Sequence, residues 1–249
     1  MSPVVPIRPA STVILVRDAE PQFEIFMLKR TTRAAFAGGM YVFPGGRVDG
    51  DDHLHKFDTL SQGPLDEQAA QQQALGAEWR GYWIACVREC FEEAGLLLAY
   101  DASGGLVPYD TDEQRDRWQA LRSPIHSGAL GLDDLCTNEA VTLALDRIHF
   151  LNRFVTPLGR PRRFDTRFFI AESPPQQAGV HDQLETVASE WISPTRAIAE
   201  SEAGNFDLMF VTKIQLQRIA EFKTVSEVIQ MARDNRNFPV FRPKLPRSN

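Results

Sequence analysis

Residues 79–94 constrain the fold of this chain more than any other stretch. They read WRGYWIACVRECFEEA and are followed by Gly95. The spacing of apolar side chains predicts an α-helix over this range, and a glycine in this place commonly ends a helix. One face of the helix is apolar and consists of Ile84, Val87, Phe91 and Ala94. Such a face needs an apolar partner, so we expect the helix to pack against a sheet.

The opposite face of the predicted helix carries three carboxylates. Glu89, Glu92 and Glu93 are separated by three and four positions, which places them on one stripe. Carboxylates crowded in this way repel one another by roughly 0.2–0.5 kcal/mol per pair. A hard divalent cation such as Mg²⁺ or Mn²⁺ would reverse that penalty, because it takes oxygen ligands. Taken alone, the helix leaves a solvated acidic surface as the alternative.

The rest of the chain mixes strand and helix signals, which predicts an α/β protein. Apolar and alternating runs predict strands at 11–17, 23–29, 40–43, 150–155, 163–171 and 187–192. Apolar residues at helical spacing predict further helices at 111–122, 195–200, 207–222 and 225–233. No linker or repeat divides the sequence, so we expect a single domain over residues 1–249. Within it, about 53–80 is polar and insertion-like, and about 205–235 forms a helical C-terminal section.

Composition and charge exclude several classes of function. The 27 basic and 33 acidic side chains give a net charge of −6, which is unfavourable for binding nucleic-acid phosphates. The apolar runs are far shorter than the ~20 residues that a membrane span needs. The first nine residues contain three prolines and no apolar stretch, so we expect no secretory signal. Three cysteines are a sparse, odd set that favours a reducing compartment, and we therefore expect a cytoplasmic protein.

A glycine-rich loop, FPGGRVDGDD at residues 43–52, precedes the acidic helix. Together the two segments resemble the box of the Nudix hydrolase family, G-x5-E-x7-R-E-U-x-E-E-x-G-U, in which U is apolar. Residues 88–96 match the second half without a gap. In the first half, Gly46 takes the place of the box glycine, and Asp52 stands where the family usually has glutamate.

The spacing within this box departs from the family pattern. Gly46 and Arg88 are 42 positions apart, against 14 in the family, which implies an insertion of 28 residues. A split box of this kind resembles the Nudix subfamily that includes a peroxisomal coenzyme A diphosphatase. The resemblance implies a Nudix-type α/β/α sandwich with a mixed β-sheet, an insertion inside the box and extra C-terminal helices.

The resemblance also implies an activity. Nudix enzymes use Mg²⁺ or Mn²⁺ to hydrolyse a nucleoside diphosphate linked to another moiety, so the implied partner is a small-molecule nucleoside diphosphate. CoA or acyl-CoA is the first substrate expected, and ADP-ribose, a dinucleotide or a nucleotide sugar is the alternative. From another class, the chain would be a non-catalytic Nudix-fold module that binds a nucleotide. Family members are often dimers, which makes the resemblance compatible with a homodimer.

Roles for individual residues follow from the same resemblance. The catalytic set would be Arg88, Glu89, Glu92 and Glu93. The three glutamates would bind the metal, with the carbonyl group of Gly46 as a further ligand. Glu89 would be the general base, with Glu185 as the second choice. Substrate contacts are expected from Arg30, Arg33, Gly45 and Arg163.

Some residues near these positions keep two interpretations. Arg162 is a second candidate for a phosphate contact beside Arg163. Phe164 or Phe168 either stacks on a base or belongs to the core of the sheet. The five histidines receive no role from the sequence.

Overall fold

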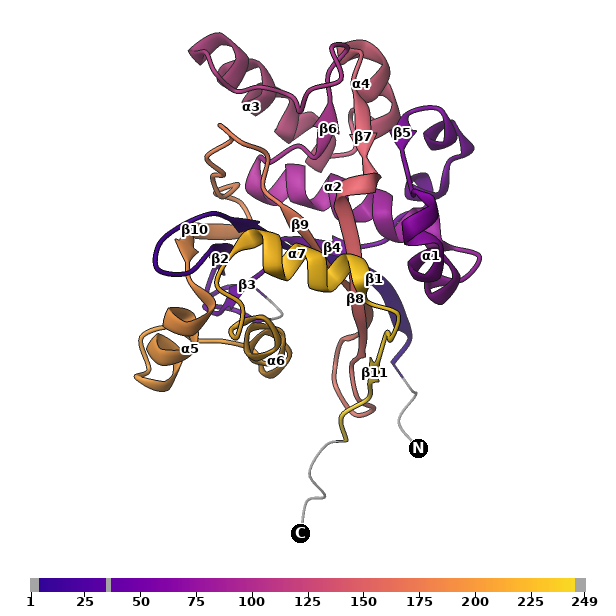
Figure 1. Cartoon of the computed structure of the whole chain (residues 1–249). Helices are drawn as coiled ribbons and strands as arrows, with labels where there is room; N and C mark the ends of the chain where they lie inside the picture. Colours follow the sequence, from indigo (N-terminus) through magenta and orange to yellow (C-terminus); the bar gives the residue numbers. More distant parts are fainter. Residues whose placement is uncertain (1–4, 35–36, 245–249) are drawn as a thin grey trace.

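The computed structural model describes residues 5–34 and 37–244 of the 249. Its centre is a sheet built from segments throughout the chain, in the order β10–β2–β1–β9–β8–β11, with β3 beside β2 and β4 beside β1 (Figure 1). β1 runs parallel to β9 and antiparallel to β2 and β4, so the sheet is mixed, as expected. The strands are β1 Ile7–Arg17, β2 Glu24–Arg30, β3 Tyr41–Val42, β4 Gly45–Arg47, β8 Ile148–Val155, β9 Arg163–Glu172, β10 Thr186–Ile192 and β11 Val240–Phe241.

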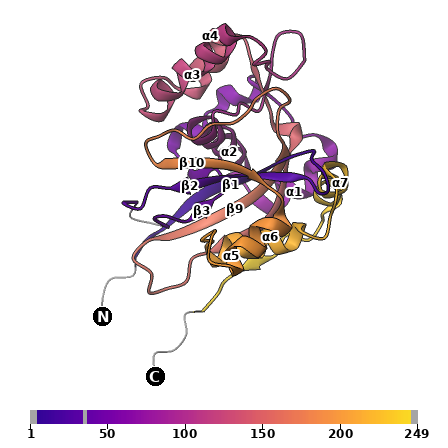
Figure 2. The ribbon, with the colours of Figure 1, turned by 90° about the vertical axis from the view of Figure 1, so that its left-hand side faces the viewer.

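Helices cover both faces of this sheet (Figure 2). The helices on one face are α1 Ala69–Leu75, α2 Trp79–Ala94, α3 Asp112–His126 and α4 Leu132–Glu139. The helices on the other face are α5 Pro194–Glu202, α6 Phe210–Ile219 and α7 Val225–Asp234. This arrangement is the expected α/β/α sandwich.

Strand β1 shows why the two faces have separate cores. Val13 and Leu15 pack toward α2, whereas Ile14 and Val16 pack toward α5, α6 and α7, and all four are fully buried. A strand buried on both faces needs a continuous apolar run rather than an alternating one. The sequence VILV at residues 13–16 provides that run.

Helix α2 begins at Trp79 and ends at Ala94, as predicted. Gly95 follows in the left-handed conformation (φ 67°), and its N–H donates to the carbonyl oxygen of Phe91 at 2.9 Å. A glycine adopts this conformation without the steric cost that a Cβ would bring, which explains why the helix ends here.

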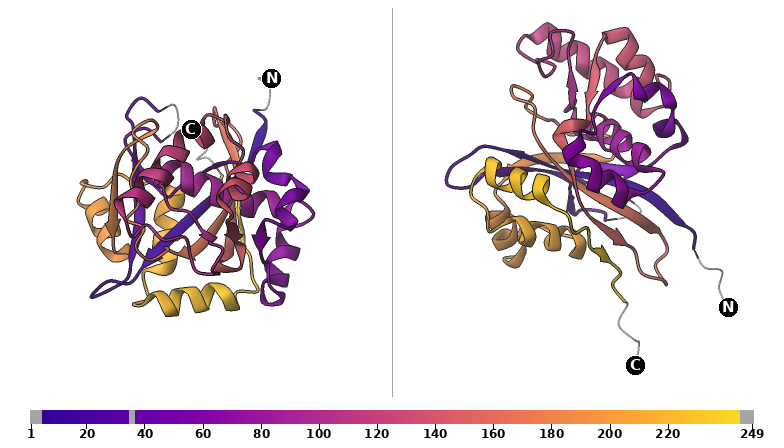
Figure 3. Two further views of the ribbon diagram at one scale, coloured as in Figure 1. Left: turned by 90° about the horizontal axis from the view of Figure 1, so that it is seen from above. Right: turned by 45° about the vertical axis from the view of Figure 1, so that its right-hand side comes forward.

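The insertion-like segment folds against the α2 side of the sheet (Figure 3). It contains the 3₁₀ turns η2 His55–Asp58 and η3 Asp66–Gln68, the strand β5 Ser61–Gln62 and helix α1. Strand β5 joins β6 Ala99–Tyr100 and β7 Thr142–Ala144 in a small second sheet. The buried amide of Gln68 donates to the carbonyl oxygens of Leu145 and Ile148, at 3.0 and 2.9 Å. The segment is therefore anchored to the start of β8.

Several features of the fold depart from the sequence-based expectations. Gly45–Arg47, expected to lie in a loop, forms strand β4. Helix α4 and the small sheet were not expected as separate elements. The helix expected at 207–222 is shorter and spans Phe210–Ile219. Among the described residues, no helix is both long and apolar enough to cross a bilayer.

Candidate active site

Strand β1 fixes the glycine loop and the acidic helix relative to each other. Thr12 pairs with Gly45 where β4 lies along β1. The neighbouring Ser11 hydroxyl donates to the carbonyl oxygen of Tyr82 in α2 at 2.6 Å. The contact between loop and helix is closed by the Gly45 N–H, which donates to Glu93 Oε2 at 2.9 Å. A main-chain donor thus holds one of the three glutamates.

Glycine is required at both positions of this loop because the backbone lies against its neighbours. A Cβ on Gly45 would overlap the backbone of Ser11 and Thr12. A Cβ on Gly46 would overlap the carboxylate of Glu89. Only residues without a side chain allow β4 to approach both β1 and α2 so closely.

Arg88 joins the two halves of the site. Its Nε and one terminal nitrogen donate to Asp52 Oδ1 and Oδ2, each at 2.9 Å, and Asp52 is only 2% exposed. The other terminal nitrogen donates to Glu89 Oε1 at 3.0 Å and to Glu92 Oε1 at 3.1 Å. The Arg88 guanidinium also donates to the carbonyl oxygen of Arg47 at 2.8 Å. One side chain therefore orients two of the three glutamates and connects them to the glycine loop.

The acidic face of α2 is buried rather than solvated. Glu92 and Glu93 are 7% and 4% exposed. Burial raises the pKa of Glu89 to about 8 and is opposed by the charge of Arg88. Burial also raises the pKa of Glu92, and it raises the pKa of Glu93 well above its usual range. Burial thus disfavours the charged forms of all three carboxylates, and a nearby positive charge favours them.

Two further residues contact the glutamates from outside the box. Arg30 at the end of β2 donates to Glu185 Oε2 at 2.8 Å and lies 3.8 Å from Glu93 Oε1. His126 at the end of α3 has its Nδ1 3.5 Å from Glu92 Oε2. That Nδ1 is buried and makes no hydrogen bond within the described part of the chain. These contacts add a cation and an imidazole to the rim of the acidic cluster.

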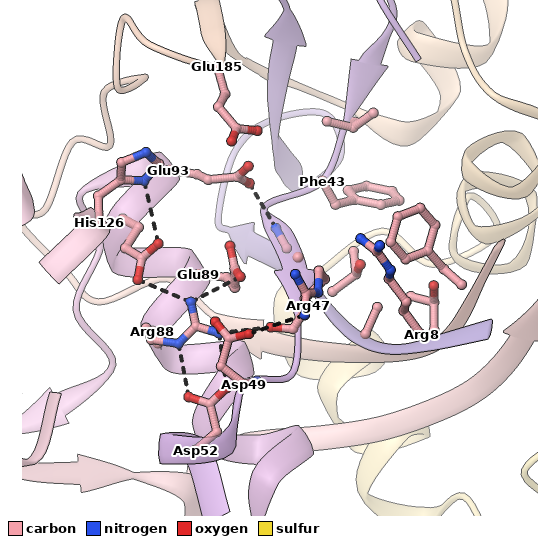
Figure 4. Close-up of a pocket in the computed structure, with 18 of the residues that line it drawn as sticks. Arg8, Phe43, Arg47, Asp49, Asp52, Arg88, Glu89, Glu93, His126 and Glu185 are labelled. Atoms are coloured by element: carbon pink, nitrogen blue, oxygen red, sulfur yellow. Dashed lines mark hydrogen bonds and ion pairs between the residues drawn. The ribbon is translucent and has the colours of Figure 1, made fainter. Parts of the chain in front are cut away.

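All of these groups face one cavity of about 630 Å³ (Figure 4). Its lining includes the glycine loop, the α2 glutamates and the turn between α3 and α4. Its other walls come from β1, β8, β9 and the start of α6. The cavity size lies within the usual range for small-molecule sites. The acidic cluster therefore lies beside a space that can accept an organic ligand.

Comparison with known proteins identifies the family. The family model of the NUDT19 Nudix domain matches residues 62–208, which is more than half of the chain. This chain belongs to the NUDT19-type Nudix hydrolase family.

Among its Nudix relatives is a putative nudix hydrolase 7 of Caenorhabditis elegans, 28% identical over 216 residues, which cover 87% of this chain and 61% of the relative. An acyl-coenzyme A diphosphatase NUDT19 of Xenopus laevis is 23% identical over 236 residues, with 83% of this chain and 62% of the relative covered. The human protein of that name is 25% identical over 250 residues, covering 83% and 63%. The chain thus spans about three-fifths of the length of these relatives.

A solved structure supports the same fold. The NUDIX hydrolase from Alicyclobacillus acidocaldarius matches with a TM-score of 0.70 and 24% sequence identity, covering 91% of this chain and 96% of that chain. The Nudix sandwich expected from the sequence is therefore the observed fold.

The structure separates the predicted substrate contacts of this Nudix chain into two groups. Arg30, Gly45 and Glu185 line the cavity together with the box residues. Arg33 is exposed and does not line the cavity. Arg163 does not line it either, because its guanidinium donates to the carbonyl oxygens of Thr156 and Val5 at 3.3 and 3.1 Å.

For other residues near the Nudix site, the sequence left the role undecided or gave no indication of one. Arg162, the neighbour of Arg163, does line the cavity. Phe164 and Phe168 also line it, but Phe168 is 4% exposed and belongs to the core, whereas Phe164 is half-buried. His126 has no sequence signal because it lies far along the chain from Glu92, and only the packing of α3 brings the two together.

The donor chemistry of the Nudix box fits a divalent cation. Burial disfavours the charged forms of the three carboxylates, a divalent cation would favour them, and all donors are oxygens, as Mg²⁺ and Mn²⁺ prefer. Within the described residues, no group of three or more His, Cys, Asp and Glu side chains already has the arrangement of a metal site. Arg88 holds Glu89 and Glu92 in their present orientation, so an ion would have to compete with that guanidinium for them.

Proposed function

We propose that this protein hydrolyses the diphosphate linkage of a nucleoside diphosphate derivative, with Mg²⁺ or Mn²⁺ as cofactor and CoA or acyl-CoA as the first substrate. The observation that carries this proposal is the buried acidic stripe of α2 at the wall of the cavity. Glu89, Glu92 and Glu93 would hold the metal, and the Gly46 carbonyl would be a further ligand. When bound, the cation supplies charge neutralisation of the diphosphate and lowers the pKa of a water molecule.

Groups of the chain itself orient the glutamates that would face that linkage. The Gly45 N–H keeps Glu93 turned toward the glycine loop. Arg88 is a positioning residue, because it holds Glu89 and Glu92 while bound to Asp52. Residues that hydrogen-bond to metal ligands hold those ligands in place, and they affect metal affinity and activity.

Two carboxylates can accept the proton of the attacking water. Glu89 is the first assignment because its side chain lies beside Gly46 and is 12% exposed. Glu185 is the second, since it faces the cavity from the loop before β10 and its side chain is 48% exposed. Replacing Glu185 by glutamine distinguishes them: kcat falls strongly if Glu185 is the base and changes little if the base is Glu89, which would also hold the metal.

CoA esters are the favoured substrates because relatives with matching sequence carry the name acyl-coenzyme A diphosphatase. The cavity also contains arginines, which suit a phosphate-rich ligand. ADP-ribose, dinucleotides and nucleotide sugars contain the same kind of linkage and are the alternatives.

The chain would work as one domain over 1–249. Its three cysteines are buried and unpaired, which agrees with a reducing compartment such as the cytoplasm.

A substrate panel tests the proposal. The protein is incubated with Mg²⁺ or Mn²⁺ and CoA, acyl-CoA, ADP-ribose, a diadenosine polyphosphate or a nucleotide sugar, and kcat/KM is measured for each. We expect the highest value for CoA or an acyl-CoA. A higher kcat/KM for ADP-ribose would identify ADP-ribose, rather than CoA, as the substrate. If none of the compounds is hydrolysed, the proposed enzymatic activity is contradicted and a nucleotide-binding module is favoured.

A further inference from the structure

Helix α3 is fixed against the C-terminal end of α2 by a buried arginine. Arg122 is 4% exposed, and one of its terminal nitrogens donates to the carbonyl oxygens of Glu92 and Glu93, each at 3.0 Å. The other terminal nitrogen donates to Gln119 Oε1 at 2.9 Å, which orients the guanidinium from within α3. A cation at this end of a helix is also favoured by the helix dipole. Helix α3 is therefore held directly against the part of α2 that carries the acidic stripe.

His126 lies one turn after Arg122 on α3, so the two side chains share one face of the helix. Its Nδ1 lies 3.5 Å from Glu92 Oε2. That nitrogen is buried and makes no hydrogen bond within the residues that the structure describes. Buried polar atoms are nearly always hydrogen-bonded, so one without a partner requires an explanation, such as a bound ion. His126 and Glu92 both line the cavity, so an ion in the cavity can reach both (Figure 4).

The carboxylate of Glu92 has a different neighbour at each oxygen. Oε1 accepts a hydrogen bond from Arg88 at 3.1 Å, whereas Oε2 faces His126. Two ligand atoms of one cation, each about 2.1 Å from it, lie about 3 to 3.5 Å apart. The separation of His126 Nδ1 and Glu92 Oε2 therefore matches that of two atoms that bind the same ion.

We infer that His126 is a nitrogen ligand of the divalent cation, which it binds through Nδ1 beside Glu92 Oε2, and that it makes the site select Mn²⁺ over Mg²⁺. Mg²⁺ takes oxygen ligands, whereas imidazole suits first-row transition metals. Glutamate and histidine ligands occur together in di-manganese carboxylate proteins. The inference rests on the proposed function for the cation itself, and it adds a metal-selecting residue from outside the box.

Pulsed electron paramagnetic resonance of the full chain with bound Mn²⁺ tests the inference without turnover, because it detects a nitrogen bonded to the ion. We expect a nitrogen coupling in the wild type and its loss in His126→Gln. The glutamine keeps a polar group that can hydrogen-bond to Glu92, but it removes the imidazole. His181→Gln is the matched control and should keep the coupling, because His181 lies 3.3 Å from Ser189 Oγ through its Nδ1 and does not line the cavity.

Metal affinity distinguishes a ligand from a residue that only positions Glu92. Calorimetry measures Kd for Mn²⁺ and for Mg²⁺ with the wild type, His126→Gln and His181→Gln. We expect the ratio of the Mg²⁺ Kd to the Mn²⁺ Kd to fall at least about tenfold in His126→Gln and to stay unchanged in His181→Gln. A residue that only hydrogen-bonds to Glu92 would affect both ions equally, so an unchanged ratio in His126→Gln would overturn the inference.

Two spectroscopic outcomes would also overturn it. One is a wild-type spectrum without nitrogen coupling, and the other is a coupling that persists in His126→Gln. The substrate panel is a separate measurement. Hydrolysis of CoA with Mn²⁺ but without nitrogen coupling would remove this inference alone, whereas nitrogen coupling without hydrolysis of any compound would remove the proposed function alone.

Discussion

Asp52 and Arg88 form a two-point ion pair, although 35 residues lie between them in the sequence and the insertion accounts for most of that separation. Asp52 sits in the 3₁₀ turn η1 Gly50–His53, just before the insertion, and its Oδ2 also accepts the N–H of Asp49 at 2.8 Å. The two halves of the box therefore stay in contact, although the insertion lies between them in the sequence. The shorter side chain of aspartate still reaches the arginine.

Replacing Asp52 with asparagine should destabilise the fold strongly. The substitution removes the charge of a buried partner and leaves the Arg88 guanidinium in a site where it is 13% exposed. Breaking a buried pair in this way costs about 3 kcal/mol in the free energy of unfolding. Urea denaturation measures the difference. Asp49→Asn is the control, because Asp49 lies 3.6 Å from the same guanidinium but its side chain is 53% exposed. Equal losses in both variants would contradict a special role for Asp52.

Divalent metal should stabilise the protein through the α2 glutamates. At about 100 times its Kd, Mn²⁺ is expected to add about 2.7 kcal/mol to the free energy of unfolding, and removal with EDTA should reverse the effect. Glu92→Gln should lose most of this gain, because it removes one charged oxygen donor from the site. The matched control is Glu172→Gln, at the exposed end of β9. Thermal denaturation with and without Mn²⁺ is the measurement, and an unchanged gain in Glu92→Gln would argue against these ligands.

His149 should make the fold sensitive to acid. The side chain is 1% exposed, and burial, together with the charge of Arg233, lowers its pKa to about 4 from the usual 6.5. In the unfolded chain this histidine is protonated below about pH 6.5, whereas in the folded chain it is protonated only near pH 4. The free energy of unfolding therefore falls as the pH drops from 6.5 to 4. This residue alone should lower the free energy of unfolding by about 2 kcal/mol between about pH 7 and pH 5.

Urea denaturation at both pH values checks the effect of His149. In His149→Phe, the loss of stability on acidification should be smaller by about 2 kcal/mol than in the wild type. His55→Gln serves as the control, because its side chain is 90% exposed. An identical loss in His149→Phe and in the wild type would contradict the assignment.

Local signals in the sequence predicted the scaffold of the site. The apolar face and Gly95 gave both ends of α2, and the spacing of its glutamates predicted the acidic stripe. The continuous apolar run predicted the buried part of β1. These features depend on residues close together in the chain, so periodicity and a terminating glycine are sufficient to find them.

The remaining features depend on tertiary contacts. Gly45–Arg47 has little intrinsic preference for a strand and becomes β4 because it pairs with β1. Whether Arg162 or Arg163 faces the cavity depends on where β9 begins and on its register, since neighbouring strand residues point to opposite faces. His126 reaches Glu92 only through the packing of α3. The burial of the glutamates likewise depends on the elements that pack around α2, and the helix alone does not determine it.

The most direct test of the central claim, that the buried glutamates of α2 support cleavage of the CoA diphosphate, is product analysis by mass spectrometry. Wild type and Glu93→Gln are incubated with CoA and Mg²⁺; the glutamine keeps an oxygen that can accept the Gly45 N–H, so the fold is retained. We predict equal amounts of adenosine 3′,5′-bisphosphate and 4′-phosphopantetheine from the wild type, and a rate at least about 100-fold lower in Glu93→Gln. Intact CoA after prolonged incubation with the wild type, or equal rates for the two proteins, would contradict the claim.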